Sequence, residues 1–187
     1  MISSAVSAIV DELNQFLKIR FRLDEDRVIL SNLVGPDGNS SLKEMNKVVV
    51  SVVNIQEEKL GKPKNNSVVS IGSKPPVFLN IFILFTSVFD EKLNKESLKF
   101  ISAVVSFFQN KKLFTPGDTP QLDSSIEKIV MDIYNLDFKD QSSMFSTLGA
   151  KYSPCIMYKM RMVAIDEGTM DYTPGVISER GTDTSSE

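Results

Sequence analysis

The sequence of 187 residues contains no histidine, no tryptophan and a single cysteine. Without histidine, the chain cannot use histidine-activated nucleophiles, histidine general bases or histidine metal ligands. The lone Cys155 can neither form an internal disulfide nor supply a thiolate zinc site. We therefore expect no metal and no cofactor, which leaves carboxylates as the remaining groups for catalysis.

The sequence also lacks a glycine-rich loop of the phosphate-binding kind. Gly35 and Gly38 lie in the run VGPDGNS, whose composition is typical of a turn. Adjacent acids occur at Glu57 and Glu58 and at residues 24–26, and the burial statistics of acids favour solvated charges over a catalytic pair. The sequence therefore predicts a protein that is not an enzyme.

Charge and hydropathy limit the classes of partner. The 21 basic and 24 acidic residues give a net charge of −3, which argues against nucleic acid as the main partner. The most apolar segment, residues 77–89, is shorter than the roughly 20 residues of a membrane-spanning helix. Residues 1–10 lack the basic start and apolar centre of a signal peptide. We expect neither a nucleic acid nor a membrane as partner.

Two amphipathic helices are predicted from apolar residues that recur every three or four positions. Ser3 or Ser4 can cap the first, and the second spans residues 94–110 with Asn94 as its candidate cap. The first helix carries its apolar residues on one stripe, at Val6, Ile9, Val10, Leu13, Phe16 and Leu17.

The next part of the chain combines an ambiguous segment with a short helix. Residues 125–136 fit both helical and strand periodicity, and we interpret them as a strand because two helices already cover a sheet of this size. Asp140 or Ser142 is the candidate cap of a short helix that ends at Leu148.

Three further strands are predicted at residues 27–34, 47–58 and 77–89. The strand at 47–58 begins valine-rich and turns polar from Asn54, which is typical of a strand that projects beyond the core. The strand at 77–89 is apolar on both faces and should be central, with Asn80 as a buried core amide rather than a ligand.

A long strand after Pro154 alternates between two faces. One face is apolar, whereas the other carries Lys159 and Arg161 between apolar residues. Because buried cations are costly unless they are matched, we predict that this face meets an acidic surface. The alternative left open by the sequence is a solvated outer face.

Together these elements predict an α+β domain, with a mostly antiparallel sheet of four or five strands and helices packed on one face. We expect one domain over residues 1–166, a mobile arm or loop at 59–76 and a flexible C-terminal tail at 167–187. The uncovered face and the long strand at 47–58 invite pairing with another chain. Composition and pattern alone thus predict an oligomeric, non-enzymatic domain.

Four motifs carry a resemblance to a known family. They are residues 49–58 (VVSVVNIQEE), 75–86 (PPVFLNIFILFT), 101–109 (ISAVVSFFQ) and the block 148–166. In this order they resemble the tail-terminator or cap proteins of extracellular contractile injection systems, of the antifeeding-prophage and Photorhabdus virulence cassette type. The resemblance extends over residues 1–166.

The resemblance implies a structural role, similar to that of phage tail terminators. It implies a hexameric ring that ends the inner tube and the sheath at the distal end of a phage tail-like particle and so controls its length. The implied partners are other copies of the chain, the tube protein and the sheath protein, with assembly in the bacterial cytoplasm and a particle that is released or cell-associated. A closing ring needs a heterologous interface, for which the candidate residues are Asn54, Glu57, Glu58, Lys62, Lys64, Tyr152, Lys159 and Arg161.

Two other functions remain open on the sequence. In a small-molecule or carbohydrate-binding module, Tyr152, Tyr158 and Arg161 would contribute to a pocket. An enzyme with paired carboxylates is the second alternative, although no pair of acids here has the spacing of a site.

Overall fold

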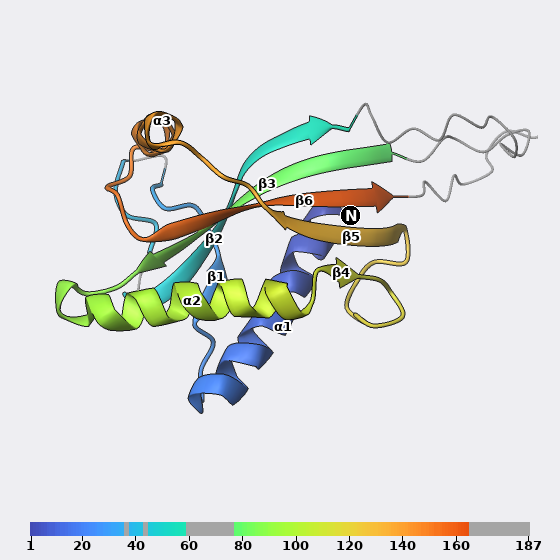
Figure 1. The fold of residues 1–187 in the computed structure, drawn as a ribbon, viewed down its shortest axis with the longest axis horizontal. Helices are drawn as coiled ribbons and strands as arrows, with labels where there is room; N and C mark the ends of the chain where they lie inside the picture. Colours follow the sequence, from blue (N-terminus) through green and yellow to red (C-terminus); the bar gives the residue numbers. More distant parts are fainter. Residues whose placement is uncertain (36–37, 43–44, 59–76, 165–187) are drawn as a thin grey trace, which may run out of the picture.

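The computed structural model describes residues 1–35, 38–42, 45–58 and 77–164 (Figure 1). The segment 59–76 and the tail 167–187, for which the sequence predicts mobility, lie outside the described residues. The elements follow one another as α1 (Ile2–Phe21), β1 (Val28–Leu30), β2 (Lys47–Glu57), β3 (Val77–Val88), a 3₁₀ turn η1 (Glu91–Leu93), α2 (Asn94–Asn110), β4 (Leu113–Phe114), β5 (Ile126–Ile133), α3 (Phe138–Leu148) and β6 (Cys155–Ala164).

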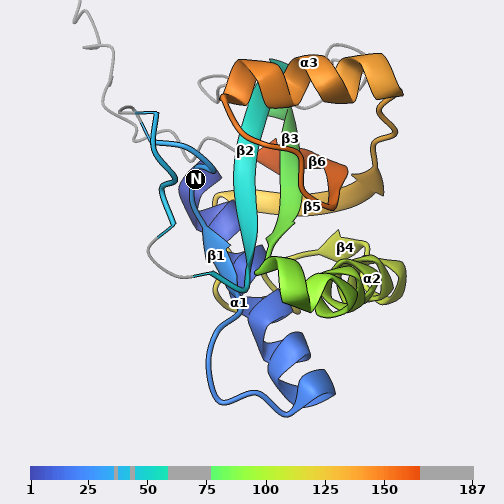
Figure 2. The ribbon, with the colours of Figure 1, turned by 90° about the vertical axis from the view of Figure 1, so that its left-hand side faces the viewer.

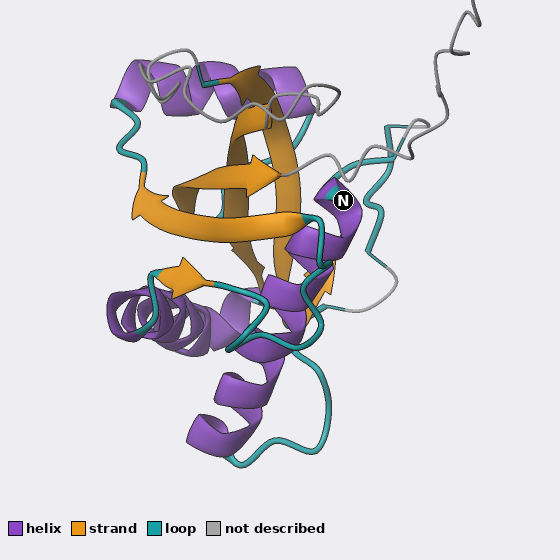
Figure 3. Cartoon of the chain, turned by 90° about the vertical axis from the view of Figure 1, so that its right-hand side faces the viewer, coloured by secondary structure: helices purple, strands orange, loops and turns teal. Residues whose placement is uncertain are grey.

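The strands form one sheet in the order β1-β2-β3-β6-β5-β4. The pair of β1 and β2 is parallel, and the other pairs are antiparallel. The sheet lies between two helical layers: α1 and α2 pack on one face, called here the first face, and α3 crosses the other, called the second face (Figures 2 and 3). The predicted α+β class is therefore confirmed.

The main core lies between the first face and the two long helices. The predicted apolar stripe of α1 is buried there, together with the side chains of α2 at helical spacing. Alternate residues of the strands meet these helices, including Ile81, Ile83 and Phe85 of β3 and Tyr158 and Met160 of β6. The predicted alternation of β6 is thus confirmed on this face.

A smaller core lies between the second face and α3. It joins Val49, Phe82, Leu84 and Met157 of the sheet to Phe145 of α3. Strand β3 is therefore buried on both faces, as its sequence predicts for a central strand.

Two expectations about the architecture were wrong in detail. The sheet has six strands rather than four or five, because β4 spans only two residues, too few to show a period in the sequence. The strand predicted at residues 27–34 is present as the shorter β1, and the sheet is mostly antiparallel as predicted, with β1 and β2 as its parallel pair. The helices do not share one face, because the apolar side chains on the second face also need cover, which α3 provides.

The helix caps also differ from those expected. Helix α1 begins after Met1 without a side-chain cap, so neither Ser3 nor Ser4 has this role. Helix α2 follows a 3₁₀ turn that Asp90 caps, and Asn94 is already helical. For α3 the cap is Asp137, whose Oδ1 accepts a hydrogen bond from the Asp140 backbone N–H at 2.7 Å.

A buried asparagine fixes the margin of the sheet at β1. Asn14 of α1 donates through Nδ2 to the carbonyl oxygen of Val28 (2.8 Å), and its Oδ1 accepts from the backbone N–H groups of Val28 (2.8 Å) and Arg27 (3.0 Å). The amide therefore takes the place of a neighbouring strand along β1, and no apolar periodicity in the sequence signals it.

Tyr158, a large and fully buried aromatic residue of the main core, carries a hydroxyl group into the apolar interior. The ring of Tyr158 lies 4.5 Å from that of Phe108 and 5.7 Å from that of Phe85, measured between centroids. Its hydroxyl is buried and has no hydrogen-bond partner among the described residues. Burial raises the pKa of this hydroxyl from 10.0 to about 12.

This raised pKa predicts a specific loss of stability in alkali. Between pH 10 and 12 the unfolded tyrosine ionises while the folded one keeps its proton, so the free energy of unfolding falls as the pH rises. A pKa difference of about two units between the folded and unfolded tyrosine corresponds to a loss of about 2–3 kcal/mol in the free energy of unfolding. We expect Tyr158→Phe, which has no hydroxyl to ionise, not to show this loss. Urea unfolding of both proteins from pH 8 to 12 measures it; parallel curves would show that Tyr158 is not responsible.

Candidate assembly interface

The second face of the sheet has a covered end and an open end. Helix α3 crosses the sheet over the starts of β2 and β6, where the side chains are apolar. Beyond α3 the same face becomes polar and charged, with Asn80 on β3, Asp132 on β5, and Lys159 and Arg161 on β6. We call this region the open end. It is the part of the sheet that no described helix covers.

The cation Arg161 has its acidic partner within its own sheet. Its Nη2 lies 2.6 Å from Oδ2 of Asp132, and both side chains are partly exposed. Asp132 is the cross-strand neighbour of Lys159 in the sheet register, but its carboxylate pairs with Arg161, at the next position along the same face. Of the two predicted cations, Arg161 is thus paired with an acid of this chain. Lys159 makes no ion pair with any described residue.

Asn80 ties the projecting end of β2 to the centre of the sheet. It is buried, and its Nδ2 donates to Oε2 of Glu58 at 2.8 Å. Asn80 is therefore a buried core amide, as predicted, whose Nδ2 has a hydrogen-bond partner. Its Oδ1 has no partner among the described residues. Glu58 and Arg161 line the same hollow of about 490 Å³ at the open end, with Phe78, Lys128 and Val163.

The outer margin of β2 continues this region. Strand β1 pairs with β2 only over Val48–Val50, and no other described strand lies outside β2 (Figure 1). A bulge between Val52 and Asn54 shifts the register with β3 by one residue. As a result Asn54 joins the second face beside Phe82, and Ile55 joins the first face beside Ile81.

The structure separates the predicted interface residues into two groups. Asn54, Glu57, Glu58, Lys159 and Arg161 gather at the open end and the adjoining part of β2. Tyr152 lies at the other end of β6, where it is 68% exposed. Lys62 and Lys64 lie outside the described residues.

Tyr152 belongs to a groove on α3 instead. Its ring packs against Phe145 with 5.6 Å between centroids, and the groove of about 600 Å³ also contains Phe138 and Ser142. Phe138 is 86% exposed. Phe138 was not among the predicted site residues, because an aromatic residue at the first position of a helix gives no sign in the sequence of its exposure.

The alternative pocket of Tyr152, Tyr158 and Arg161 is not formed. Tyr158 is buried in the main core on the first face, Arg161 lies at the open end, and Tyr152 lies beyond the start of β6. The strand parity alone already separates Tyr158 from Arg161, because odd and even residues point to opposite faces.

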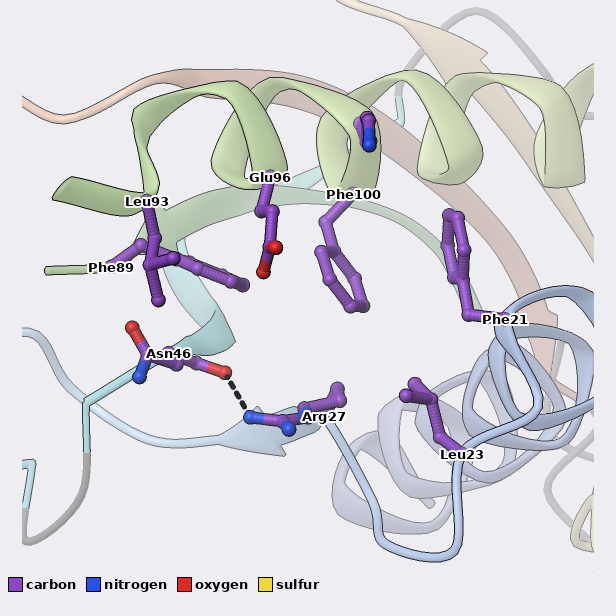
Figure 4. A pocket seen from close by; sticks show the side chains of 9 residues that line it. Phe21, Leu23, Arg27, Asn46, Phe89, Leu93, Glu96 and Phe100 are labelled. Carbon is purple, nitrogen blue, oxygen red and sulfur yellow. Dashed lines mark hydrogen bonds between the residues drawn. The ribbon is translucent and has the colours of Figure 1, made fainter.

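A further hollow lies between α1, α2 and the start of β2 (Figure 4). It has a volume of about 280 Å³, and Phe21, Phe89 and Phe100 form much of its wall. Arg27 donates through Nη1 to the carbonyl oxygen of Asn46 at 3.1 Å and pairs through Nη2 with Glu25 at 2.9 Å. The guanidinium is therefore engaged in holding this loop.

The described residues offer binding surfaces rather than reactive groups. They contain no cluster of three or more metal-ligating side chains. Burial raises the pKa of the Cys155 thiol, against a smaller lowering by Gln141, so the thiol is not activated as a nucleophile. None of the described helices is long and apolar enough to cross a membrane.

Comparison with known proteins identifies related folds. A family model described as the Pvc16 N-terminal domain matches residues 5–179. Two solved structures are similar over nearly the whole chain. One is the PVC sheath/tube terminator of an extracellular contractile injection system, in its extended state, with a TM-score of 0.60 and 13% identity. The other is the tube-terminating cap of the anti-feeding prophage, with a TM-score of 0.58 and 12% identity.

The similarity covers 100% and 94% of this chain but only 64% and 60% of those two proteins, so the chain spans less than two thirds of their length. No curated protein matches the sequence. These findings agree with the family resemblance predicted from the motifs, and they show that the chain has the fold of tube terminators.

The pairing of Arg161 with Asp132 predicts a small and reversible effect on stability. Arg161→Asp places two acids side by side and should lower the free energy of unfolding by up to about 1 kcal/mol, as expected for an exposed pair. Adding Asp132→Arg restores opposite charges and should recover most of the loss. Urea unfolding at low and at 1 M salt measures both; a swap variant no more stable than the single variant would show that the pair contributes nothing.

Proposed function

Because the chain belongs to the Pvc16 N-terminal domain family, we propose that it is a structural cap of a contractile injection system. In this role it forms a hexameric ring on the last layer of the inner tube and sheath, stops their growth and sets the particle length. One observation carries the proposal: 100% and 94% of the chain align with two proteins described as terminators of such particles. The proposal includes no catalytic activity.

The surfaces of the domain support a ring. A head-to-tail ring needs two unlike patches on each subunit that complement each other. The described residues carry two unlike patches that could take part in such contacts: the charged open end, with Lys159 and Arg161, and the aromatic groove on α3, with Phe138 and Tyr152. From Cys155 to Arg161, β6 separates them by about 20 Å, at roughly 3.3 Å per residue.

The proposed partners follow from this role. They are neighbouring copies of the chain, the tube protein and the sheath protein, in a particle that assembles in the bacterial cytoplasm. The cap occupies the distal end of the particle. Neither a nucleic acid nor a membrane is part of the proposal.

A carbohydrate-binding module is a second candidate, favoured by the groove on α3. This groove contains two exposed aromatic rings, Phe138 and Tyr152, with Gln141 and Ser142, and no charged side chain lines it. Aromatic surfaces with a few neutral polar groups suit sugar rings. Calorimetric titration with a panel of oligosaccharides separates the two functions. A carbohydrate-binding module should bind at least one of them and lose that binding in Tyr152→Ala, whereas a cap should bind none.

Removal of the chain from a cell that makes the particles should abolish length control. We expect tubes and sheaths of widely varied length, because no subunit then blocks further addition at the end. Electron microscopy of purified particles measures the distribution, and returning the intact chain should restore one length. A narrow distribution without the chain would contradict the proposal.

Ring formation predicts a defined mass. Chains released from particle ends should sediment as an assembly of six times the 20.9 kDa of one chain. The free chain can remain monomeric if closure needs the tube as a template. Native mass spectrometry of particle ends measures the number of copies; any number other than six refutes the hexamer.

Reversing the charges at the open end should abolish capping while the fold remains. For the double variant Lys159→Glu, Arg161→Glu we expect a loss of about 1 kcal/mol or less in stability, because both positions are partly exposed. Lys92→Glu, Lys95→Glu is the matched control, since it makes the same change of charge at exposed positions around the start of α2. Normal particle length with the open-end variant would exclude this face from the interface.

A further inference from the structure

The groove on α3 is an aromatic surface that no described residue covers. Phe138 and Tyr152 stand at its sides, 86% and 68% exposed, and the buried Phe145 lies between them and the sheet. Its volume of about 600 Å³ is that of a site for a small molecule, and it can hold two large side chains. We call it the α3 groove.

The charges around the α3 groove are basic. No charged side chain lines the groove itself. Lys139 and Lys151 adjoin Phe138 and Tyr152 in the sequence, are exposed and make no ion pair with any described residue. The nearby acids are Asp137, which caps α3, and Asp140, which points to nearly the opposite side of the helix from Phe138 because it lies two positions further on. An apolar segment that carries acids therefore suits this surface.

Residues 165–179, called here the C-terminal segment, have this composition. The family model extends to residue 179, so the segment belongs to the same domain, although it lies outside the described residues. It contains four acids and no basic residue, and Met170 and Tyr172 stand on either side of Asp171. Methionine and tyrosine are enriched at protein interfaces.

The other long segment outside the described residues, 59–76, has the opposite charge. It contains four lysines and no acid. Lys139 and Lys151 would repel it, whereas they attract the C-terminal segment.

Met170 and Tyr172 cannot reach the α3 groove of their own chain. Strand β6 begins beside α3 and ends at the open end (Figure 1), and from Cys155 to Ala164 it spans about 30 Å at roughly 3.3 Å per residue. The C-terminal segment would have to return over this distance and further, to Tyr152. Fully extended, it reaches at most about 22 Å from Ala164 to Met170 and about 29 Å to Tyr172.

We propose that Met170 and Tyr172 of one copy occupy the α3 groove of a neighbouring copy, with Asp171 beside Lys139 and Lys151. The contact joins two unlike surfaces, so it is heterologous and can close a ring. This inference rests on the proposed function, because the ring at the particle end brings the copies together.

Cross-linking provides the first test. Ser142, an exposed residue of the groove, is changed to cysteine together with Met170, and Cys155→Ser removes the natural thiol. On particle ends, a short bismaleimide should link this chain into a ladder that ends at six copies. An equal mixture of the Ser142→Cys and Met170→Cys chains should give dimers and nothing larger, since each chain has one thiol.

The pattern of cross-links identifies the occupant of the groove. A link within one chain would show that the C-terminal segment folds onto its own domain. A link from Ser142→Cys to a tube or sheath protein would assign the groove to that protein. Either result would overturn the inference, as would particle ends that carry the chain but give no link, and none of these results affects the proposed function.

Substitution in the C-terminal segment provides the second test. Met170→Ser, Tyr172→Ser removes the apolar side chains and should weaken binding to uncapped particles by about tenfold or more. Met170→Leu, Tyr172→Phe is the matched control, which keeps the apolar surface and should bind as the original chain does. Binding is measured by co-sedimentation of the full chain with particles purified from cells that lack it.

The stability of the free chain completes this test. The serine variant should unfold at the same urea concentration as the original chain, because the contact forms only between copies. A large loss of stability would place the segment on its own domain, and equal binding by the serine and control variants would exclude it from the interface; both contradict the inference. If the unmodified chain does not bind particle ends, the proposed function fails, and this inference fails with it.

Discussion

The structure depends on one constraint, which is that β3 is apolar on both faces. A strand of this kind cannot be covered by helices on one side alone, because half of its side chains would remain in water. Helices α1 and α2 bury one set, including Ile81 and Ile83, and α3 buries the other, including Phe82 and Leu84. The three-layer arrangement follows directly from this strand.

The same constraint explains why the open end exists. Strand β3 has 12 residues and extends about 40 Å, whereas α3 crosses the strands and covers little more than its own diameter of about 10 Å (Figure 1). The second face therefore changes from apolar to charged where α3 no longer covers it. The polar end of β2, where Asn80 donates to Glu58, lies in this region, so the proposed interface results from the mismatch between a long strand and a short helix.

Much of this fold could be predicted from periodicity, because long elements repeat their pattern several times. The four long strands and three helices, including the ambiguous segment that forms β5, were predicted close to their observed limits. The short β1 lies within the strand predicted at 27–34, whereas β4 was not predicted, because two residues carry no period. The anchoring of β1 by Asn14 was not predicted either, since a single amide has no pattern. At the candidate site, the shared face of Lys159 and Arg161 could be derived from parity. The partner Asp132 could not, because it depends on the pairing of β5 with β6.

The central claim is that this fold forms the terminal layer of a contractile injection particle, and imaging of particle ends tests it most directly. Cryo-electron microscopy of intact particles should resolve six copies of the 1–164 fold in a closed ring at the distal end, with the open end and β2 in contact with neighbouring chains. A distal end built without this fold, or this fold located only elsewhere in the particle, would contradict the account.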